Sequence, residues 1–167
     1  RHDVGYDALL AANPGIDSPT MAAASVIVLP TQFSPPELSS GITINLAERR
    51  LYYLDENNRK LYTYPVSIGR PGWETPVGEF FIMEKIFKPP WVVPESIREA
   101  EAKKGVVIPK VIQPGSQNPL GEYAFRLSSP TYLIHVNFMP NKVGMRSTSG
   151  CMSLYKEDMK ELFDLVE

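Results

Sequence analysis

The chain has 167 residues, of which 43% are apolar, which is enough for one well-packed domain with at most a small appendage. Seventeen Lys and Arg are scattered against nineteen Asp and Glu, so the formal net charge of −2 indicates no nucleic-acid partner. The longest nearly apolar stretch, Met21 to Leu29, is shorter than the roughly 20 residues that span a bilayer. Cys151 is the single cysteine, which excludes a disulfide scaffold.

The N-terminal residues differ in pattern from the rest of the chain. Asp7 to Ala12 suits a short helix and Ser25 to Leu29 a short strand, so we expect a short N-terminal α/β arm over residues 1–33. Residues 34–40 are rich in Pro and Ser and are interpreted as a linker. The main domain is then expected at 41–167.

The arm also carries a partial resemblance. Val4 to Ile16, followed by Val28 to Pro30, resembles the second half of a LysM module, the small unit that binds peptidoglycan. The first half of such a module is absent from the sequence. Residues 1–33 are therefore interpreted either as a partial LysM-like segment or as an arm that packs on the main domain.

The main domain has a mostly strand-like pattern. Alternating apolar residues from Gly41 and two strands flanking the turn Asp55-Glu-Asn-Asn58 predict a β-meander. A helix is expected between Pro94 and Gly105, and an apolar stripe at i, i+3, i+4 and i+7 predicts a C-terminal helix. The chain is thus predicted to be mainly β with minor α. After the strand that begins at Gly41, the strands of the main domain are expected at Leu51 to Leu54, Leu61 to Ile68, Phe80 to Phe87, Tyr123 to Leu127 and Tyr132 to Val136. Its first helix is expected at Glu95 to Lys104, and the apolar stripe of its C-terminal helix consists of Met159, Leu162, Phe163 and Val166.

One cysteine and one histidine could carry chemistry. Cys151 follows small residues in Ser147-Thr-Ser-Gly-Cys151, which we expect to lie just before a helix, where backbone N–H groups can converge on one spot. His135 ends an apolar strand sixteen residues earlier and could generate the thiolate. On residue type alone, a buried structural cysteine and a structural histidine are the commoner case.

Several ordered motifs favour the catalytic interpretation. Ile134-His135 followed by Gly144-Met-Arg-Ser-Thr-Ser-Gly-Cys151 resembles the active-site signature of the YkuD-type L,D-transpeptidases. Thr75-Pro-Val-Gly-Glu-Phe80 resembles the T-P-x-G-x-F segment of that family, and Asn118-Pro-Leu-Gly121 its N-P-x-G segment. The resemblance covers nearly all of 41–167. It implies a mixed-strand β-sandwich of the L,D-transpeptidase catalytic type.

The resemblance also implies a mechanism on peptidoglycan stem peptides. Cys151 would attack the carbonyl between the third and fourth stem residues, expel D-alanine and hold the remainder as a thioester, which an amine resolves. His135 would be the acid and base, oriented by the backbone carbonyl of Val136 or its neighbour. Backbone N–H groups of Gly150 and Cys151 would bind the developing oxyanion.

Four further residues are substrate-binding candidates by resemblance or position. Arg146 would hold the active-site loop or a substrate carboxylate, and a solvated surface arginine is the alternative. Ser149 and Asn137 are polar neighbours of the site, with local hydrogen bonding as the alternative. Ser153 stands where the family commonly has Arg or Asn, which suggests a shortened polar anchor. Val136 replaces the family's usual glycine after the histidine, and we expect it to narrow access to the site.

Other functions stay open on the sequence. A sortase is disfavoured because no arginine follows Cys151. An L,D-carboxypeptidase using water shares every residue named above. The Val136 and Ser153 departures, together with the LysM-like arm, motivate a catalytically weakened peptidoglycan-binding or scaffold protein. The acceptor is expected to be a neighbouring stem or an outer-membrane lipoprotein. We expect a periplasmic monomer whose signal peptide is absent from this sequence, with no transmembrane segment, no nucleic-acid partner, no cofactor and no metal site.

Overall fold

The site lies in a four-stranded mixed sheet. The computed structural model describes residues 3–16, 26–38, 40–129 and 131–167, and its largest sheet has the strand order β11-β9-β8-β5. Strand β9 pairs antiparallel with β8 and parallel with β11, so the sheet is mixed as expected. The bounds are β5 Ile82–Phe87, β8 Tyr123–Leu127, β9 Leu133–Val136 and β11 Met152–Leu154. Three of these strands were predicted, and β11 was not.

A second sheet is the predicted meander. Strands β1 (Gly41–Asn45), β2 (Arg50–Asp55) and β3 (Lys60–Pro65) pair antiparallel in that order. The Asp55 carboxylate accepts hydrogen bonds from the Asn58 backbone and side chain, which closes the β2–β3 turn. The strand expected to continue to Ile68 stops at Pro65 instead.

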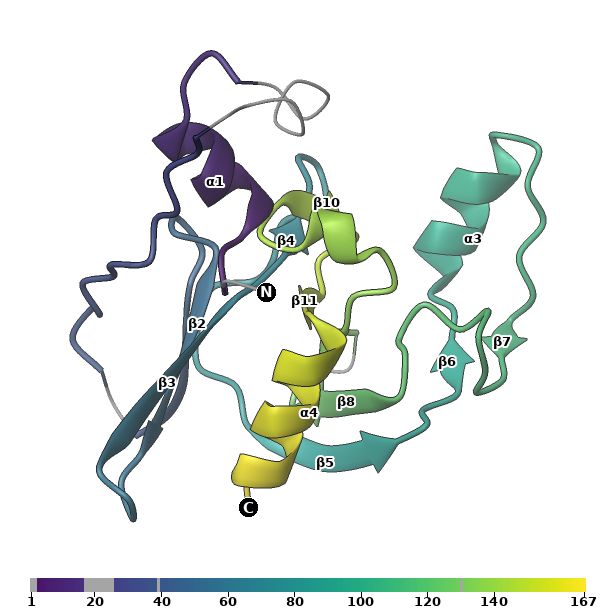
Figure 1. Cartoon of the computed structure of the whole chain (residues 1–167). Helices are drawn as coiled ribbons and strands as arrows, with labels where there is room; N and C mark the ends of the chain where they lie inside the picture. The colour runs from purple at the N-terminus through teal and green to yellow at the C-terminus, as the bar shows by residue number, and fades with distance from the viewer. Residues whose placement is uncertain (1–2, 17–25, 39, 130) are drawn as a thin grey trace.

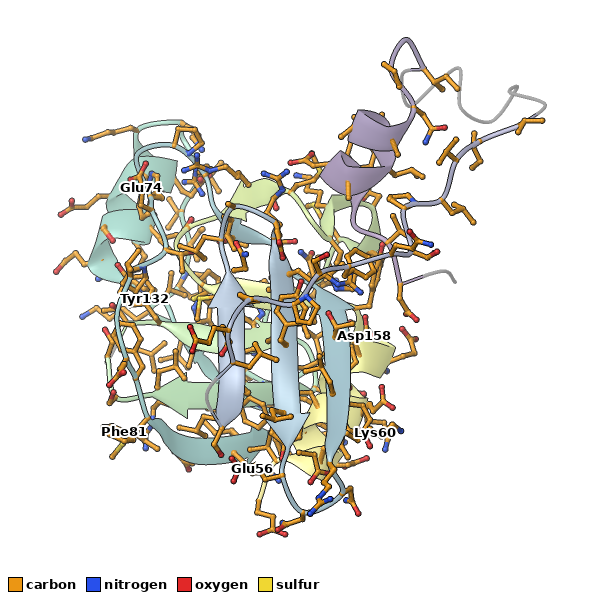
Figure 2. All side chains as sticks on the ribbon, turned by 90° about the vertical axis from the view of Figure 1, so that its left-hand side faces the viewer. Glu56, Lys60, Glu74, Phe81, Tyr132 and Asp158 are labelled. Carbon is orange, nitrogen blue, oxygen red and sulfur yellow. The ribbon has the colours of Figure 1, made fainter. Side chains whose placement is uncertain are left out.

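After β3 the chain forms a short separate strand, β4 (Ile68–Gly69), which pairs in parallel with β10 (Arg146–Thr148). This pairing joins residues almost eighty positions apart in the sequence. It brings the segment after β4 alongside the loop that leads to Cys151 (Figure 1).

The core is formed between the two sheets and the C-terminal helix. Helix α4 (Lys156–Leu165) presents Met159 and Leu162 inward, and both are fully buried with Phe125 of β8 and Leu51 of β2. Burying an aliphatic or aromatic side chain contributes about 1.5–3 kcal/mol. The predicted apolar stripe of this helix is therefore confirmed as a core face, and the chain is mostly β with small helices around mixed sheets (Figure 1).

A helix and a small two-stranded sheet lie beside the larger sheets. Helix α3 (Glu95–Ala102) begins after Pro94, as expected, and ends two residues before the predicted position. Strands β6 (Trp91–Val92) and β7 (Val111–Ile112) pair antiparallel at its base and were not predicted. A 3₁₀ turn, η1 (Pro140–Lys142), follows β9. No helix in the described ranges is long and apolar enough to cross a membrane.

The N-terminal arm contacts the main domain. Helix α1 (Tyr6–Ala12) confirms the predicted helix, and the Tyr6 N–H donates to the Val143 carbonyl at 2.8 Å. The backbones of Gly5 and Gly144 cross so closely that a Cβ on Gly144 would overlap the Gly5 Cα. The predicted strand is wrong for 26–29, which are irregular, and its first residue lies outside the described residues. These contacts support the packing-arm interpretation.

Candidate active site

His135 occupies the central part of the mixed sheet. The residue is 9% exposed, and Nδ1 lies 2.7 Å from the carbonyl oxygen of Val136. Because a carbonyl only accepts, Nδ1 must carry the proton, and this leaves Nε2 with a free lone pair. Burial lowers the pKa of His135 to about 4, while the bond to the Val136 carbonyl acts in the opposite direction. The ring is therefore neutral at pH 7 and is held in the tautomer that a general base needs.

The strand register places Cys151 on the face of the sheet that carries His135. Met152 pairs with Ile134 and Ser153 pairs with His135 across the parallel β9–β11 ladder. Ile134 and Met152 both lie in the hydrophobic core. Because side chains alternate along a strand, His135 and Ser153 face the other way, and Cys151, two residues before Ser153, continues that row. The sheet thus brings the predicted nucleophile and base to one face of neighbouring chain segments.

The thiol is half-buried and neutral at rest. Burial raises the pKa of Cys151 above its ordinary value, and a hydrogen bond from the Leu133 backbone N–H partly opposes this. The sulfur also lies 3.9 Å from the Thr131 carbonyl oxygen. With a neutral thiol and a neutral imidazole on the same face of the sheet, the arrangement favours proton transfer during attack over a preformed ion pair.

Gly150 shapes the backbone at the nucleophile. Its φ of +107° favours glycine, and a Cβ there would lie 2.6 Å from the Tyr132 ring. The Gly150 carbonyl accepts from the Thr75 hydroxyl at 2.8 Å, and its N–H donates to Thr148 Oγ1 at 3.2 Å. An oxyanion could therefore use the Gly150 N–H only if that bond were released.

The segment after Cys151 corrects one expectation. The residue is followed by strand β11, and helix α4 begins only at Lys156, so a helix N-terminus does not lie directly behind the sulfur. The Thr148 hydroxyl instead donates to the Cys151 carbonyl at 2.6 Å and fixes a tight turn before the strand. Side-chain hydroxyls thus hold this loop, a role that residue spacing alone did not reveal.

Asn137 and Ser153 belong to a polar cluster rather than to an open surface. Ser153 is 1% exposed, and its hydroxyl accepts from Asn137 Nδ2 at 2.9 Å. The same amide donates to Ser67 Oγ at 3.0 Å, and Ser67 exchanges backbone hydrogen bonds with Ser153. The Asn137 side-chain oxygen accepts from the Met139 N–H at 2.8 Å. The expectation of substrate contact at Ser153 does not fit this burial, because its hydroxyl is enclosed and already bonded.

Val136 also lies elsewhere than expected. It is 5% exposed and belongs to the hydrophobic core, on the opposite face of β9 from His135. The space for its branched side chain comes from Gly121, whose φ is +70° and where a Cβ would lie 2.5 Å from Val136 Cβ. The expectation that Val136 narrows the entrance is therefore wrong, because strand alternation turns it inward.

Two arginines contact the loop that leads to Cys151. Arg146 donates from Nε to the Gly69 carbonyl at 3.3 Å and lies 3.8 Å from the Glu74 carboxylate, which supports its loop-holding alternative. Ser149 accepts from Arg70 Nη1 at 2.6 Å, and the same nitrogen donates to the Thr148 carbonyl at 3.1 Å. Sequence reasoning missed Arg70. The signal available was its position in Gly69-Arg-Pro-Gly-Trp73, just before the Thr75-Pro motif.

A metal site finds no support in the described ranges, where no group of three His, Cys, Asp or Glu side chains is placed to hold an ion.

Comparisons with known proteins identify the family to which this arrangement is similar. Residues 39–167 match the model of the L,D-transpeptidase catalytic domain. The "Probable L,D-transpeptidase YcfS" of Escherichia coli is 37% identical over 99% of this chain and 53% of its own length. The "Probable L,D-transpeptidase ErfK/SrfK" of Salmonella typhimurium is 35% identical over 99% of this chain and 54% of its own length. The chain thus spans about half the length of these relatives.

Solved structures support the same fold. A crystal structure of an Enterococcus faecium L,D-transpeptidase matches 77% of this chain and 46% of its own, with a TM-score of 0.56 and 19% identity. The catalytic domain from the same organism's enzyme, acylated by ertapenem, matches 77% of this chain and 90% of its own, with a TM-score of 0.56 and 20% identity. At these identities the likeness concerns the fold alone.

Proposed function

Because this chain belongs to the L,D-transpeptidase catalytic-domain family, we propose that it forms a Cys151 thioester with a peptidoglycan tetrapeptide stem and transfers the acyl group to an amine. The observation that carries the proposal is the 2.7 Å bond from His135 Nδ1–H to the Val136 carbonyl. It leaves Nε2 as an acceptor on the face of the sheet to which the register assigns Cys151. The same pair was derived from the sequence motifs.

Acylation begins with a neutral pair. As the sulfur attacks the carbonyl carbon between the third and fourth stem residues, its proton passes to His135 Nε2. The tetrahedral oxyanion is bound by the Cys151 N–H, joined by the Gly150 N–H when its bond to Thr148 opens. Collapse breaks the peptide C–N bond, and the imidazolium gives its proton to the leaving D-alanine amine. The thioester and a neutral His135 remain.

Transfer repeats these steps in reverse order. The acceptor amine attacks the thioester carbonyl and gives its proton to His135 Nε2. Collapse then breaks the C–S bond, and the thiolate takes the proton back from the imidazolium. A neutral resting His135 suits both half-reactions, because it accepts a proton at the start of each and returns it at the end.

The acceptor proposed is the side-chain amine of a neighbouring stem's diamino acid, or a lysine of an outer-membrane lipoprotein. Both acceptors lie outside the cytoplasmic membrane, which supports our proposal of a periplasmic location. The alternative of a non-catalytic scaffold loses its motivation at both departures. Val136 packs into the core, so it does not block the entrance to the site. Ser153 is enclosed in a polar cluster, so its hydroxyl does not stand in for a missing polar anchor on the substrate surface.

Turnover by the parent and by variants at His135 tests the proposal. The parent should release D-alanine from a soluble tetrapeptide stem, and His135→Ala should lower acylation by about a hundredfold or more at neutral pH. Raising the pH should partly rescue the variant by supplying thiolate. The matched control is Asn137→Ser, which changes a polar side chain directly after β9 and should keep an acylation rate close to that of the parent. A parent without D-alanine release contradicts the proposed function, and a His135→Ala variant that acylates at the parent's rate contradicts the assignment of the base.

A further inference from the structure

We propose that Arg70 reads the C-terminal carboxylate of the acyl donor and thereby selects stems that end at their fourth residue. The inference rests on the proposed function and deepens it by naming a specificity-determining residue. Arg70 directly follows β4 and is half-buried beside the loop that leads to the nucleophile. Neither the active-site motifs nor the assigned acid–base pair uses it.

The guanidinium of Arg70 is held along one edge. Nη1 donates to Ser149 Oγ at 2.6 Å and to the Thr148 carbonyl at 3.1 Å. The Arg70 backbone N–H donates to the same Thr148 carbonyl at 3.0 Å, and the guanidinium carbon lies 4.7 Å from the centre of the Trp73 ring. These contacts fix the orientation of a side chain that would otherwise lose much rotamer freedom on binding.

The other edge of the guanidinium keeps donors for a ligand. Within the part of the chain that the structure describes, Nε and Nη2 of Arg70 have no acceptor. These two nitrogens form the planar fork that binds the two oxygens of a carboxylate in parallel. A fork that is already oriented costs less to immobilise when the ligand arrives.

The local charges favour an anion. Arg70 and Arg146 are both cations, and Glu74 is the carboxylate that lies beside Arg146. A hydrogen bond from the Gly72 N–H holds the pKa of Glu74 below its usual value, so this carboxylate is ionised at neutral pH. Glu74 is matched by Arg146, and one net positive charge remains, at Arg70.

The position of Arg70 relative to Cys151 also fits recognition of a carboxylate that lies one residue beyond the scissile bond. Ser149, the partner of Arg70, lies two residues before Cys151, which is at most about 7 Å of extended chain. In a tetrapeptide stem the terminal carboxylate belongs to the residue that follows the attacked carbonyl, about 3.8 Å further along the peptide. An added fifth residue would replace the carboxylate at that point with an uncharged amide.

The test compares two donors that differ only at this group, a tetrapeptide stem with a free C-terminus and the same peptide as its C-terminal amide. The parent should prefer the acid by about tenfold or more in kcat/KM, the scale of a charge-assisted bond. Arg70→Gln should remove most of this preference, chiefly through KM for the acid, and should leave the amide within about threefold. The matched control is Arg146→Gln, which removes the neighbouring cation and should preserve the preference.

A binding measurement separates recognition from turnover. With Cys151→Ala, which cannot form the thioester, calorimetry should show tighter binding of the acid than of the amide, and adding Arg70→Gln should equalise them. A parent that turns over both peptides without preference overturns the inference and leaves the proposed function standing. Equal losses on both peptides in Arg70→Gln, or loss of the preference in Arg146→Gln, also overturn it. A parent inert toward both peptides contradicts the proposed function itself.

Discussion

Acidification should cost this protein stability specifically through His135. Burial holds the pKa of His135 at about 4, whereas an unfolded chain keeps a histidine near 6.5. Below pH 6.5 the unfolded state therefore binds a proton on His135 and the folded state does not, so the free energy of unfolding falls until the pH reaches about 4. Each pKa unit is worth about 1.36 kcal/mol, so the full effect is about 3 kcal/mol. Above pH 6.5 both states are neutral at this residue and the contribution is constant.

The assay is urea unfolding of the parent and of His135→Gln at intervals from pH 7.5 to pH 4. Carboxylates titrate in both proteins, so their effect cancels in the difference between the two curves. The parent should lose about 2 kcal/mol more than the variant by pH 5 and about 3 kcal/mol more by pH 4. Parallel curves would refute the reasoning, because they would mean that the folded protein accepts a proton on His135 as readily as the unfolded chain does.

Two further perturbations test the surroundings of the site. Asn137→Ala should lower the free energy of unfolding by about 1–3 kcal/mol at pH 7, because it leaves the enclosed hydroxyls of Ser67 and Ser153 without their shared donor, whereas Asn137→Ser should recover part of the loss. Urea unfolding measures both, and equal stability of Asn137→Ala and the parent would contradict the cluster's structural role. Deleting residues 1–39 should lower the melting temperature and also slow D-alanine release, because the arm bonds to Val143 and crosses Gly144 directly before β10. Unchanged thermal melting with weaker binding to intact sacculi would instead favour the LysM-like interpretation.

Local signals in the sequence were sufficient to single out the candidate nucleophile and base. The motif around Cys151 and the apolar strand ending near His135 were sufficient to propose a nucleophile and a base. The orienting carbonyl was also expected at Val136 or its neighbour, and the structure has the bond at Val136. These predictions depend on contacts between residues adjacent in the chain or on neighbouring strands, which short motifs describe.

Errors arose where the answer depended on which way a strand faces. Val136 was expected at the entrance, yet alternation along β9 places it opposite His135 and inside the core. The alternation was readable from the sequence once His135 was assigned to the open face. The strand expected in the N-terminal arm is wrong for 26–29, which are irregular, and the Val28 backbone N–H and carbonyl bond to the Asn13 side chain instead of to another strand.

Long-range pairings account for what sequence reasoning missed. Ser153 became enclosed because its backbone bridges to Ser67, a residue far earlier in the chain. Arg70 reached Ser149 because β4 and β10 pair across a separation of almost eighty residues. Neither pairing has a local pattern, because each short strand spans only two or three residues.

The central claim is that Cys151, activated by His135, forms a thioester, and intact-mass measurement after exposure to an acylating substrate tests it most directly. The parent, incubated with a carbapenem or with a tetrapeptide stem lacking an acceptor, should gain the mass of the acyl group on one residue. Cys151→Ala should gain nothing while keeping its circular dichroism spectrum and its cooperative unfolding. A parent that never gains mass, or a Cys151→Ala variant that still does, would contradict the account.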